Sequence, residues 1–198
     1  MSINKQILFK KLTEFINTKY NEPDKPLLIE LCRKTICNDP TKNCIVKGKQ
    51  SDWNDLPNNK ILFHSMPNCG LPIGNLTSQL FGNIYMNEFD HWVKRELNIK
   101  HYGRYVDDFV LIHQSKAYLK SALPKLSNFL LLTLKLTLHP DKIYLQHYST
   151  GVKFLGTVIL PNRIYIVNRT KGNFYNAIEK QNRIARNHKP TKEEQSAF

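Results

Sequence analysis

The chain of 198 residues is strongly basic, with 29 Lys and Arg against 16 Asp and Glu and a formal net charge of +13. This length can bury one good core, and a polyanion is the economical counterion for such a charge. The sequence contains no apolar stretch of membrane-spanning length, no signal peptide and no zinc pattern among its four cysteines. It therefore predicts a cytoplasmic protein with reduced thiols and a nucleic-acid partner.

The first predicted element is a helix over residues 3–19, because apolar residues recur there at helical spacing. They are Ile3, Ile7, Leu8, Leu12, Phe15 and Ile16. From Cys32 to Pro72 the sequence predicts turns rather than an independent domain, since Asn-Asp-Pro, Asp-Leu-Pro and Met-Pro-Asn-Cys-Gly occur there.

A glycine-punctuated loop, Gly70-Leu-Pro-Ile-Gly-Asn-Leu-Thr-Ser-Gln79, leads into a second helix predicted over residues 76–97. Such a loop lets a nucleotide or base pair approach the backbone closely. Asn75, Ser78 and Gln79 could then donate hydrogen bonds to it. Most loop-to-helix junctions of this composition are, however, only well-capped helices.

Asp107 and Asp108 lie between two segments of β-forming residues, Tyr102–Val106 and Phe109–Ile112. The pattern predicts a strand, a tight turn and a second strand, with both carboxylates at the tip. Paired carboxylates on a rigid hairpin suit hard cations such as Mg²⁺, and a two-metal site can align an attacking hydroxyl with a departing pyrophosphate. An isolated Asp-Asp pair is usually a solvated turn, so the surrounding motifs must decide.

A third helix is predicted over about residues 115–132, and a β-hairpin over residues 143–160. These elements predict an α+β fold in which a small antiparallel sheet carries the Asp107–Asp108 hairpin and the helices pack on one side. From Arg169 to Lys192 the basic residues are accompanied by one acid, Glu179. This helical segment is a candidate nucleic-acid surface, with a solvated helix face as the alternative.

In chain order these motifs resemble the palm of the reverse transcriptases. Gly70–Gln79 resembles the second palm motif of that family, and Tyr105-Val106-Asp107-Asp108 resembles its Tyr-x-Asp-Asp box. Leu134–Lys142 resembles the segment that ends in a lysine after the second palm helix. Gly151–Gly156 resembles the hairpin that grips the primer end. The implied reaction is RNA-templated DNA synthesis from deoxynucleoside triphosphates on an RNA template and a DNA primer.

The resemblance implies a role for each motif. Asp107 and Asp108 are the catalytic ligands of two Mg²⁺ ions, with Mn²⁺ as an alternative. Lys142 is either the general acid for the leaving pyrophosphate or part of a surface turn. The other implied sites are nucleotide and template binding by Ile73, Gly74, Asn75, Ser78, Gln79 and Tyr105, and primer binding by Phe154, Leu155 and Gly156. The charge pattern adds Arg169, Arg183 and Arg186 as contacts to the nucleic-acid backbone.

Ile73 before Gly74, and Gln79 after Ser78, resemble the reverse transcriptases of bacterial and phage diversity-generating retroelements. The resemblance places Ile73 and Gln79 near the incoming nucleotide, where a changed contact loosens base selection. Packing variation is the alternative, and group II intron and retron enzymes are the nearest competitors. Enzymes of the diversity-generating type work with a small basic accessory protein, so the resemblance implies such a partner.

One part of the family pattern is missing. The palm needs a third carboxylate, normally from a strand before its first helix, and no such pattern precedes residue 70. Met1–Leu8 resembles the phrase that follows this aspartate, so we expect Met1 to be an internal methionine of a longer parent. We therefore expect a palm over residues 1–168, the start of a thumb over residues 169–198, no fingers and no activity. A nucleic-acid-binding remnant without catalysis is the alternative.

Overall fold

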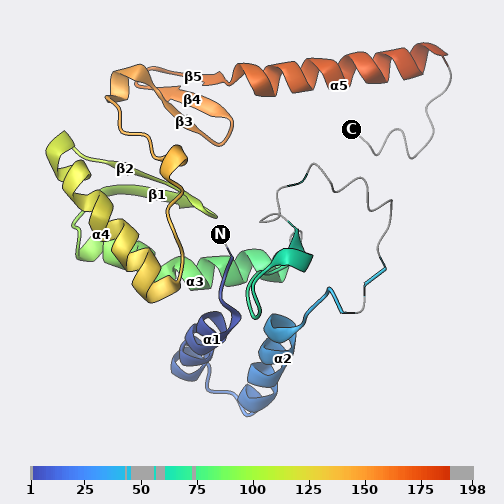
Figure 1. Cartoon of the computed structure of the whole chain (residues 1–198), viewed down its shortest axis with the longest axis vertical. Helices are drawn as coiled ribbons and strands as arrows, with labels where there is room; N and C mark the ends of the chain where they lie inside the picture. The colour runs from blue at the N-terminus through green and yellow to red at the C-terminus, as the bar shows by residue number, and fades with distance from the viewer. Residues whose placement is uncertain (1, 43, 46–55, 57–60, 73–74, 188–198) are drawn as a thin grey trace. The chain divides into compact units, whose positions relative to one another are not determined.

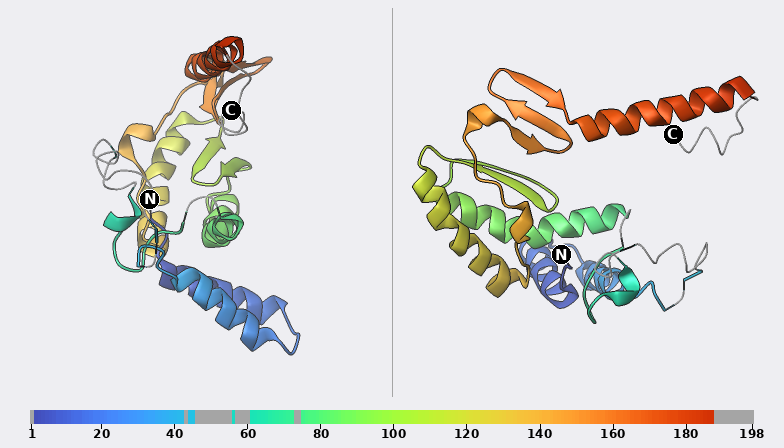
Figure 2. Two further views of the ribbon diagram at one scale, coloured as in Figure 1. Left: turned by 90° about the vertical axis from the view of Figure 1, so that its right-hand side faces the viewer. Right: turned by 45° about the horizontal axis from the view of Figure 1, so that its top comes forward.

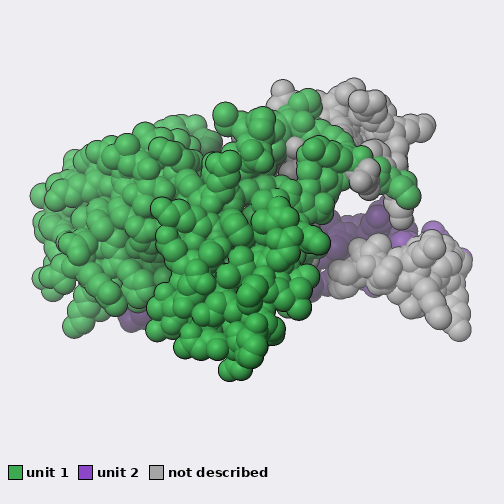
Figure 3. Space-filling view, turned by 90° about the horizontal axis from the view of Figure 1, so that it is seen from below, with its two compact units in different colours: residues 1–143 green, residues 144–198 purple. Residues whose placement is uncertain are grey.

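The computed structural model describes residues 2–42, 44–45, 56, 61–72 and 75–187. The chain divides into two compact units, residues 1–143 and 144–198, each of which is described by itself (Figure 3). The described residues form five α-helices and two small antiparallel sheets (Figure 1). The fold is therefore α+β, as the sequence predicts.

The first unit begins with two helices that pack against each other, α1 (Lys5–Lys19) and α2 (Lys25–Cys37). The Asn4 side chain caps α1, because its Oδ1 accepts hydrogen bonds from the backbone N–H groups of Gln6 and Ile7 at 3.0 and 3.1 Å. At the same end of the pair, the buried Lys5 donates its Nζ to the carbonyl oxygen of Asn38, the C-cap residue of α2, at 2.7 Å.

Helix α2 corrects the prediction of turns from Cys32 onward, which was wrong for residues 32–37. The sequence signal was weak because only Ile36 of α2 is buried, while Leu27 and Leu31 are exposed. Much of the remaining predicted turn region lies outside the described residues. Its described part contains a short 3₁₀ helix, η3 (Leu62–His64).

The centre of the unit is α3 (Leu76–Arg95), which contacts α1, β1 (His101–Tyr105) and α4 (Lys116–Leu134). It lies between α1 and the hairpin that β1 begins (Figure 2). Burial of apolar side chains from all these helices supplies the main stabilisation, at about 1.5–3 kcal/mol for each large side chain. The buried apolar residues are Leu8, Leu12, Ile16, Ile36, Phe81, Tyr85, Met86, Phe89, Val93, Leu97, Ile99, Ala122, Leu126, Leu130, Leu134 and Leu136.

A buried hydroxyl joins three segments of this core. Tyr85 donates its O–H to the carbonyl oxygen of Leu134 at 2.5 Å, and accepts the backbone N–H of Asn4 at 3.4 Å. Burial raises the pKa of this phenol. Asn4 also forms an antiparallel bridge with Cys69, which attaches the segment before α3 to the start of α1. The residues leading into α3 are thus tied to the N-terminal helix.

The second unit contains a three-stranded antiparallel sheet in the order β3 (Val152–Phe154), β4 (Thr157–Leu160) and β5 (Arg163–Ile166). Helix α5 (Asn168–Asn187) follows it. The predicted hairpin over residues 143–160 was therefore partly wrong. Residues 143–151 form no strand and include a 3₁₀ helix, η5 (Tyr148–Thr150), while β5 was missed. Among the described residues of this unit only Gly151 is buried.

Candidate active site

The two aspartates lie at the tip of an antiparallel hairpin formed by β1 and β2 (Asp108–Ile112). Tyr105 pairs with Asp108, so Val106 and Asp107 form a two-residue turn between the strands. Asp107, Asp108 and Tyr105 are all exposed. The turn therefore presents two neighbouring carboxylates to solvent on a short, register-fixed hairpin, as the sequence predicts.

Aromatic packing attaches the hairpin to α3. The ring of Phe109, on β2, lies edge-on to the buried Phe89 with 5.2 Å between ring centroids. Tyr102, on β1, makes a second edge contact with Phe89 at 6.3 Å. Phe109 lies two residues after Asp107 and Tyr102 lies four residues before Val106, so the core holds both strands of the hairpin while the turn itself stays exposed.

The turn has an unusual backbone. Val106 has φ = 53°, a left-handed conformation that is a real outlier for a β-branched residue. Asp107 is not among the residues with positive φ, so the positive angle falls on the first turn position alone. This is the sign pattern of a type II′ turn, in which glycine usually occupies that position.

A polar network lies beside this turn. Arg104 donates from Nε and Nη2 to the two carboxylate oxygens of Asp90 on α3, at 2.8 and 2.7 Å. Its Nη1 donates to the carbonyl oxygen of Val106 at 2.7 Å and to Asn83 Oδ1 at 3.3 Å. Tyr102 donates its O–H to Asp90 Oδ1 at 2.5 Å. One guanidinium thus joins helix α3 to the backbone of the turn.

Burial and the hydrogen bond to Asp90 raise the pKa of Tyr102, so this phenol stays protonated in the folded protein. The same carboxylate raises the pKa of Arg104 through its hydrogen bonds, against the opposing effect of burial. The side chain of Arg104 is 8% exposed and that of Asp90 is 27% exposed. Solvent therefore screens the attraction between Arg104 and Asp90 only weakly, and their hydrogen bonds fix the geometry of the pair.

The donor chemistry of the tip fits a hard divalent cation. Mg²⁺ is usually held by one or two carboxylates, with water molecules and substrate phosphates as its other ligands. Asp107 and Asp108 supply two such carboxylates. In the described part of the chain, no group of three or more His, Cys, Asp or Glu residues could hold a metal ion. Among the described residues, the candidate site thus consists of these two carboxylates.

The predicted nucleotide-binding residues gather at the beginning of α3. Asn75 is the N-cap residue, although its side chain makes no capping hydrogen bond, and both Asn75 and Gln79 are exposed while Ser78 is half-buried. Gln79 lies one helical turn before Asn83, which contacts Arg104. Residues four apart share a helix face, so Gln79 lies on the side of α3 that meets the hairpin. Ile73 and Gly74 lie outside the described residues.

A comparison with known protein families identifies the family of the chain. The family model described as reverse transcriptase (RNA-dependent DNA polymerase) matches residues 2–159. The chain belongs to the reverse transcriptase family. The general activity of this family is RNA-templated DNA synthesis, which uses a template, a primer and nucleotide substrates. A search of curated proteins finds no match to the chain.

Within this reverse transcriptase, the predicted primer-binding residues form a second hairpin. Phe154 pairs with Thr157, and Leu155 and Gly156 form a two-residue turn with φ of 50° and 75°. Thr157 Oγ1 donates to the Phe154 carbonyl at 2.7 Å, and Val167 N–H donates to the Gly156 carbonyl at 3.0 Å. The residue between β5 and α5 thereby supports this turn through its backbone.

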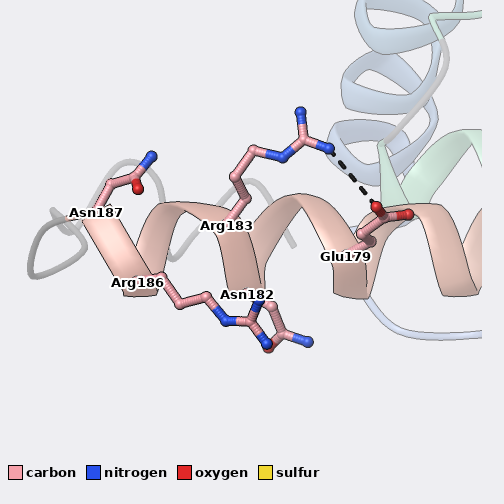
Figure 4. A pocket seen from close by; sticks show the side chains of 5 residues that line it. All are labelled: Glu179, Asn182, Arg183, Arg186 and Asn187. Atoms are coloured by element: carbon pink, nitrogen blue, oxygen red, sulfur yellow. Dashed lines mark ion pairs between the residues drawn. The ribbon is translucent and has the colours of Figure 1, made fainter.

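The remaining predicted residues are exposed. Lys142 ends a short 3₁₀ helix, η4 (Pro140–Lys142). Arg169 lies in the first turn of α5, and Arg183 and Arg186 line a surface pocket on this helix with Glu179, Asn182 and Asn187. Arg183 pairs with Glu179 at 3.6 Å, and the side chains of Arg183 and Arg186 extend to opposite sides of the helix (Figure 4). No described helix has the length and apolar character that a membrane crossing would need.

Sequence reasoning missed Asp90 and Arg104. A usable signal existed: Arg104 lies two residues after Tyr102 in β1. The two side chains therefore share the face of the strand that points toward the core. Asp90 follows the buried Phe89 on α3 and is itself half-buried. An acid and a base at such positions are candidates for buried, paired charges, but the pattern does not say which residues pair.

Proposed function

We propose that Asp107 and Asp108 are the metal-binding carboxylates of RNA-templated DNA synthesis. The observation that carries this proposal is their joint presentation on a register-fixed hairpin turn in a chain of the reverse transcriptase family. A divalent cation such as Mg²⁺, with Mn²⁺ as a substitute, would supply Lewis-acid stabilisation of the transferring phosphoryl group. The two aspartates would hold it, with their orientation fixed by the hairpin and by its contact with α3.

The other motifs would take the roles that the family resemblance implies. Asn75, Ser78 and Gln79, with Ile73 and Gly74, would line the incoming nucleotide and the template, and Tyr105 would lie beside them. Phe154, Leu155 and Gly156 would contact the primer. The exposed Lys142 would protonate the leaving pyrophosphate. The residues Ile73 and Gln79 favour a diversity-generating enzyme, with a small basic accessory protein as partner, over group II intron and retron types.

The proposal extends to the activity of this chain alone. The described residues supply two neighbouring carboxylates and no three-membered metal cluster. Because catalysis depends on precise positioning of the metal ions, we expect no extension of a primer on an RNA template by the purified chain with Mg²⁺. Template-directed extension would contradict this expectation. If that extension also falls roughly 1,000-fold in Asp107→Asn, the catalytic role of the aspartate is supported.

Metal binding tests the site without depending on activity. Mn²⁺ added to the isotope-labelled chain should broaden the backbone amide NMR signals of the turn that carries Asp107. Asp107→Asn and Asp108→Asn should reduce this broadening, because each removes a charged ligand and keeps its size. Glu22→Gln, which removes an exposed carboxylate far along the chain, is the matched control. Equal broadening in all variants would contradict the proposed metal site.

A second candidate function is nucleic-acid binding without catalysis, which the incomplete metal cluster and the basic α5 favour. If Arg169, Arg183 and Arg186 contact phosphates, replacing all three with Gln should make the slope of log affinity against log salt shallower by roughly two to three units. The matched control removes the same charge from α1 and α2 with Lys10→Gln, Lys19→Gln and Lys34→Gln, all exposed. Equal slopes for the two triple variants would assign the arginines to solubility.

A further inference from the structure

The ion pair between Asp90 and Arg104 does more than join two elements. Two guanidinium nitrogens of Arg104 are used on Asp90, and the third reaches the carbonyl oxygen of Val106. That carbonyl belongs to the residue with φ = 53°, directly before Asp107. The network therefore ends on the peptide unit that sets the direction of the first aspartate.

Val106 needs such support. A β-branched residue in the left-handed region carries a conformational cost, and strained positions persist only where their surroundings over-determine them. The side chain of Val106 is exposed and gives the turn little packing. The hydrogen bond from Arg104 and the pairing of Tyr105 with Asp108 restrain the turn instead.

Resting on the proposed function, we propose that Asp90 and Arg104 are positioning residues for the catalytic turn. Asp90 orients the guanidinium, Arg104 holds the Val106 carbonyl, and the turn then keeps the backbone conformation that directs Asp107 and Asp108 toward one cation. Asn83 assists by accepting a further hydrogen bond from Arg104 at 3.3 Å. Neither Asp90 nor Arg104 contacts the cation or the substrate in this role.

In a purely structural role, the pair would attach β1 to α3 and would not affect the turn. Arg104→Lys separates these roles, because one ammonium group retains the charge facing Asp90 but lacks the planar fork that reaches two partners at once. Arg104→Gln removes both the charge that faces Asp90 and the planar fork. Arg33, which forms a bidentate pair with Glu30 within α2 at 2.7 Å for both bonds, offers the matched control Arg33→Lys.

The conformation of Val106 can be read directly by NMR. A positive φ brings the amide proton of a residue close to its own α-proton, which gives a strong intraresidue nuclear Overhauser effect. Wild-type protein and Arg33→Lys should show this signal at Val106. Arg104→Lys and Asp90→Asn should weaken it, while the signals of Phe89 and Phe109 report that the hairpin remains packed on α3. An unchanged Val106 signal in packed Arg104→Lys and Asp90→Asn proteins would overturn the proposal.

Mn²⁺ binding supplies the second measurement. Removing a group that orients metal ligands typically weakens metal binding 10- to 100-fold, so Arg104→Lys should weaken Mn²⁺ binding at the turn about tenfold. Adding Val106→Gly to Arg104→Lys should restore most of it, because glycine adopts positive φ without support. Unchanged affinity in Arg104→Lys, or no recovery in the double variant, would overturn the positioning role.

The two proposals fail in different ways. If Asp107→Asn leaves Mn²⁺ binding unchanged, the metal site is wrong, and the Val106 signal still decides whether Arg104 holds the turn. If Asp107→Asn abolishes binding while Arg104→Lys changes neither readout, the metal site stands and the positioning role is rejected.

Discussion

The hairpin turns of β1–β2 and β3–β4 have the same length but are held by different means. Val106-Asp107 and Leu155-Gly156 each connect two antiparallel strands through two residues, and each begins with a non-glycine residue at φ near 50°. In the first hairpin a side chain, Arg104, restrains the turn from β1. In the second, the backbone N–H of Val167 and the conformation of Gly156 do so.

The hairpins also differ in what lies beneath them. The first packs on Phe89 in the core of its unit, through Tyr102 and Phe109. The second belongs to the sheet β3–β5, whose strands contain no buried residue; Gly151, directly before β3, is the only buried one among the described residues of that unit. Specific side-chain hydrogen bonds thus define the turn that presents carboxylates, whereas glycine and backbone contacts define the turn expected to meet the primer. Loss of a side-chain hydrogen bond should therefore disturb the β1–β2 hairpin most, and replacement of a glycine should disturb the β3–β4 hairpin most.

The largest expected effect is at Gly151, directly before the first strand of the second hairpin. This residue has φ = 81°, and an added Cβ would lie 2.8 Å from Val158 Cγ1 and 3.1 Å from Leu160 Cγ. Gly151→Ala should therefore destabilise the β3–β5 sheet by about 3 kcal/mol, through backbone strain and overpacking. Gly103→Ala in the first hairpin is the control, since its Cβ would meet Val110 at an ordinary 3.7 Å. Hydrogen exchange of both sheets measures the difference, and equal protection losses would contradict it.

The next effect concerns the first hairpin. Arg104→Gln should lower the free energy of unfolding of the first unit by about 2 kcal/mol, because Asp90 loses its charged partner in a poorly hydrated position and keeps only Tyr102. Arg33→Gln should cause no resolvable change, since the Arg33 and Glu30 side chains are 50% and 43% exposed. Urea unfolding compares the two variants. A larger loss of unfolding free energy in Arg33→Gln than in Arg104→Gln would contradict this prediction.

Alkaline pH should weaken the same network. The pKa of Tyr102 is raised in the folded state, while the unfolded phenol has the ordinary value of 10.0. Both states keep the proton below pH 10, so the stabilisation is complete there. Above pH 10 the unfolded state loses its proton first, and stability should fall by up to about 1.4 kcal/mol per pH unit. Tyr102→Phe should show a shallower fall in denaturant unfolding, and equal slopes would reject this contribution.

The smallest effects should come from relieving turn strain. Val106→Gly and Leu155→Gly each remove an exposed side chain from a residue with positive φ. Each should stabilise its own hairpin by about 1 kcal/mol or less, because relief of strain is partly offset by the greater freedom of glycine in the unfolded chain. Hydrogen exchange at the paired residues Tyr105 and Phe154 can detect both changes. A clear loss of protection would show that these side chains support their turns.

Much of the fold could be predicted because its main signals are local. The predicted helices over residues 3–19, 76–97 and about 115–132 correspond to α1, α3 and α4, whose buried residues repeat at helical spacing. The β1–β2 hairpin follows from β-forming residues on both sides of an Asp turn. Helix α2 and strand β5 escaped prediction because they have little burial: Ile36 alone in α2, and none in β5.

The candidate site was predictable only in part, for a different reason. Asp107 and Asp108 are adjacent in sequence, so their pairing is visible in the chain itself. The partnership of Asp90 with Arg104 spans 14 residues and depends on the way β1 crosses α3, which no local pattern encodes. The boundary predicted between palm and thumb, at residues 168 and 169, stays a prediction. The compact units divide at residues 143 and 144, and the strand β5 ends at Ile166.

The buried hydroxyl of Tyr85 has a consequence for the order of folding. Its hydrogen bonds close sequence separations of 81 residues to Asn4 and 49 residues to Leu134. Contacts of such long range form only after the intervening chain has been brought together, which makes them late and cooperative events. Helices α1 and α4 should therefore complete their docking onto α3 in the same step, so that the first unit folds as a whole rather than one helix at a time.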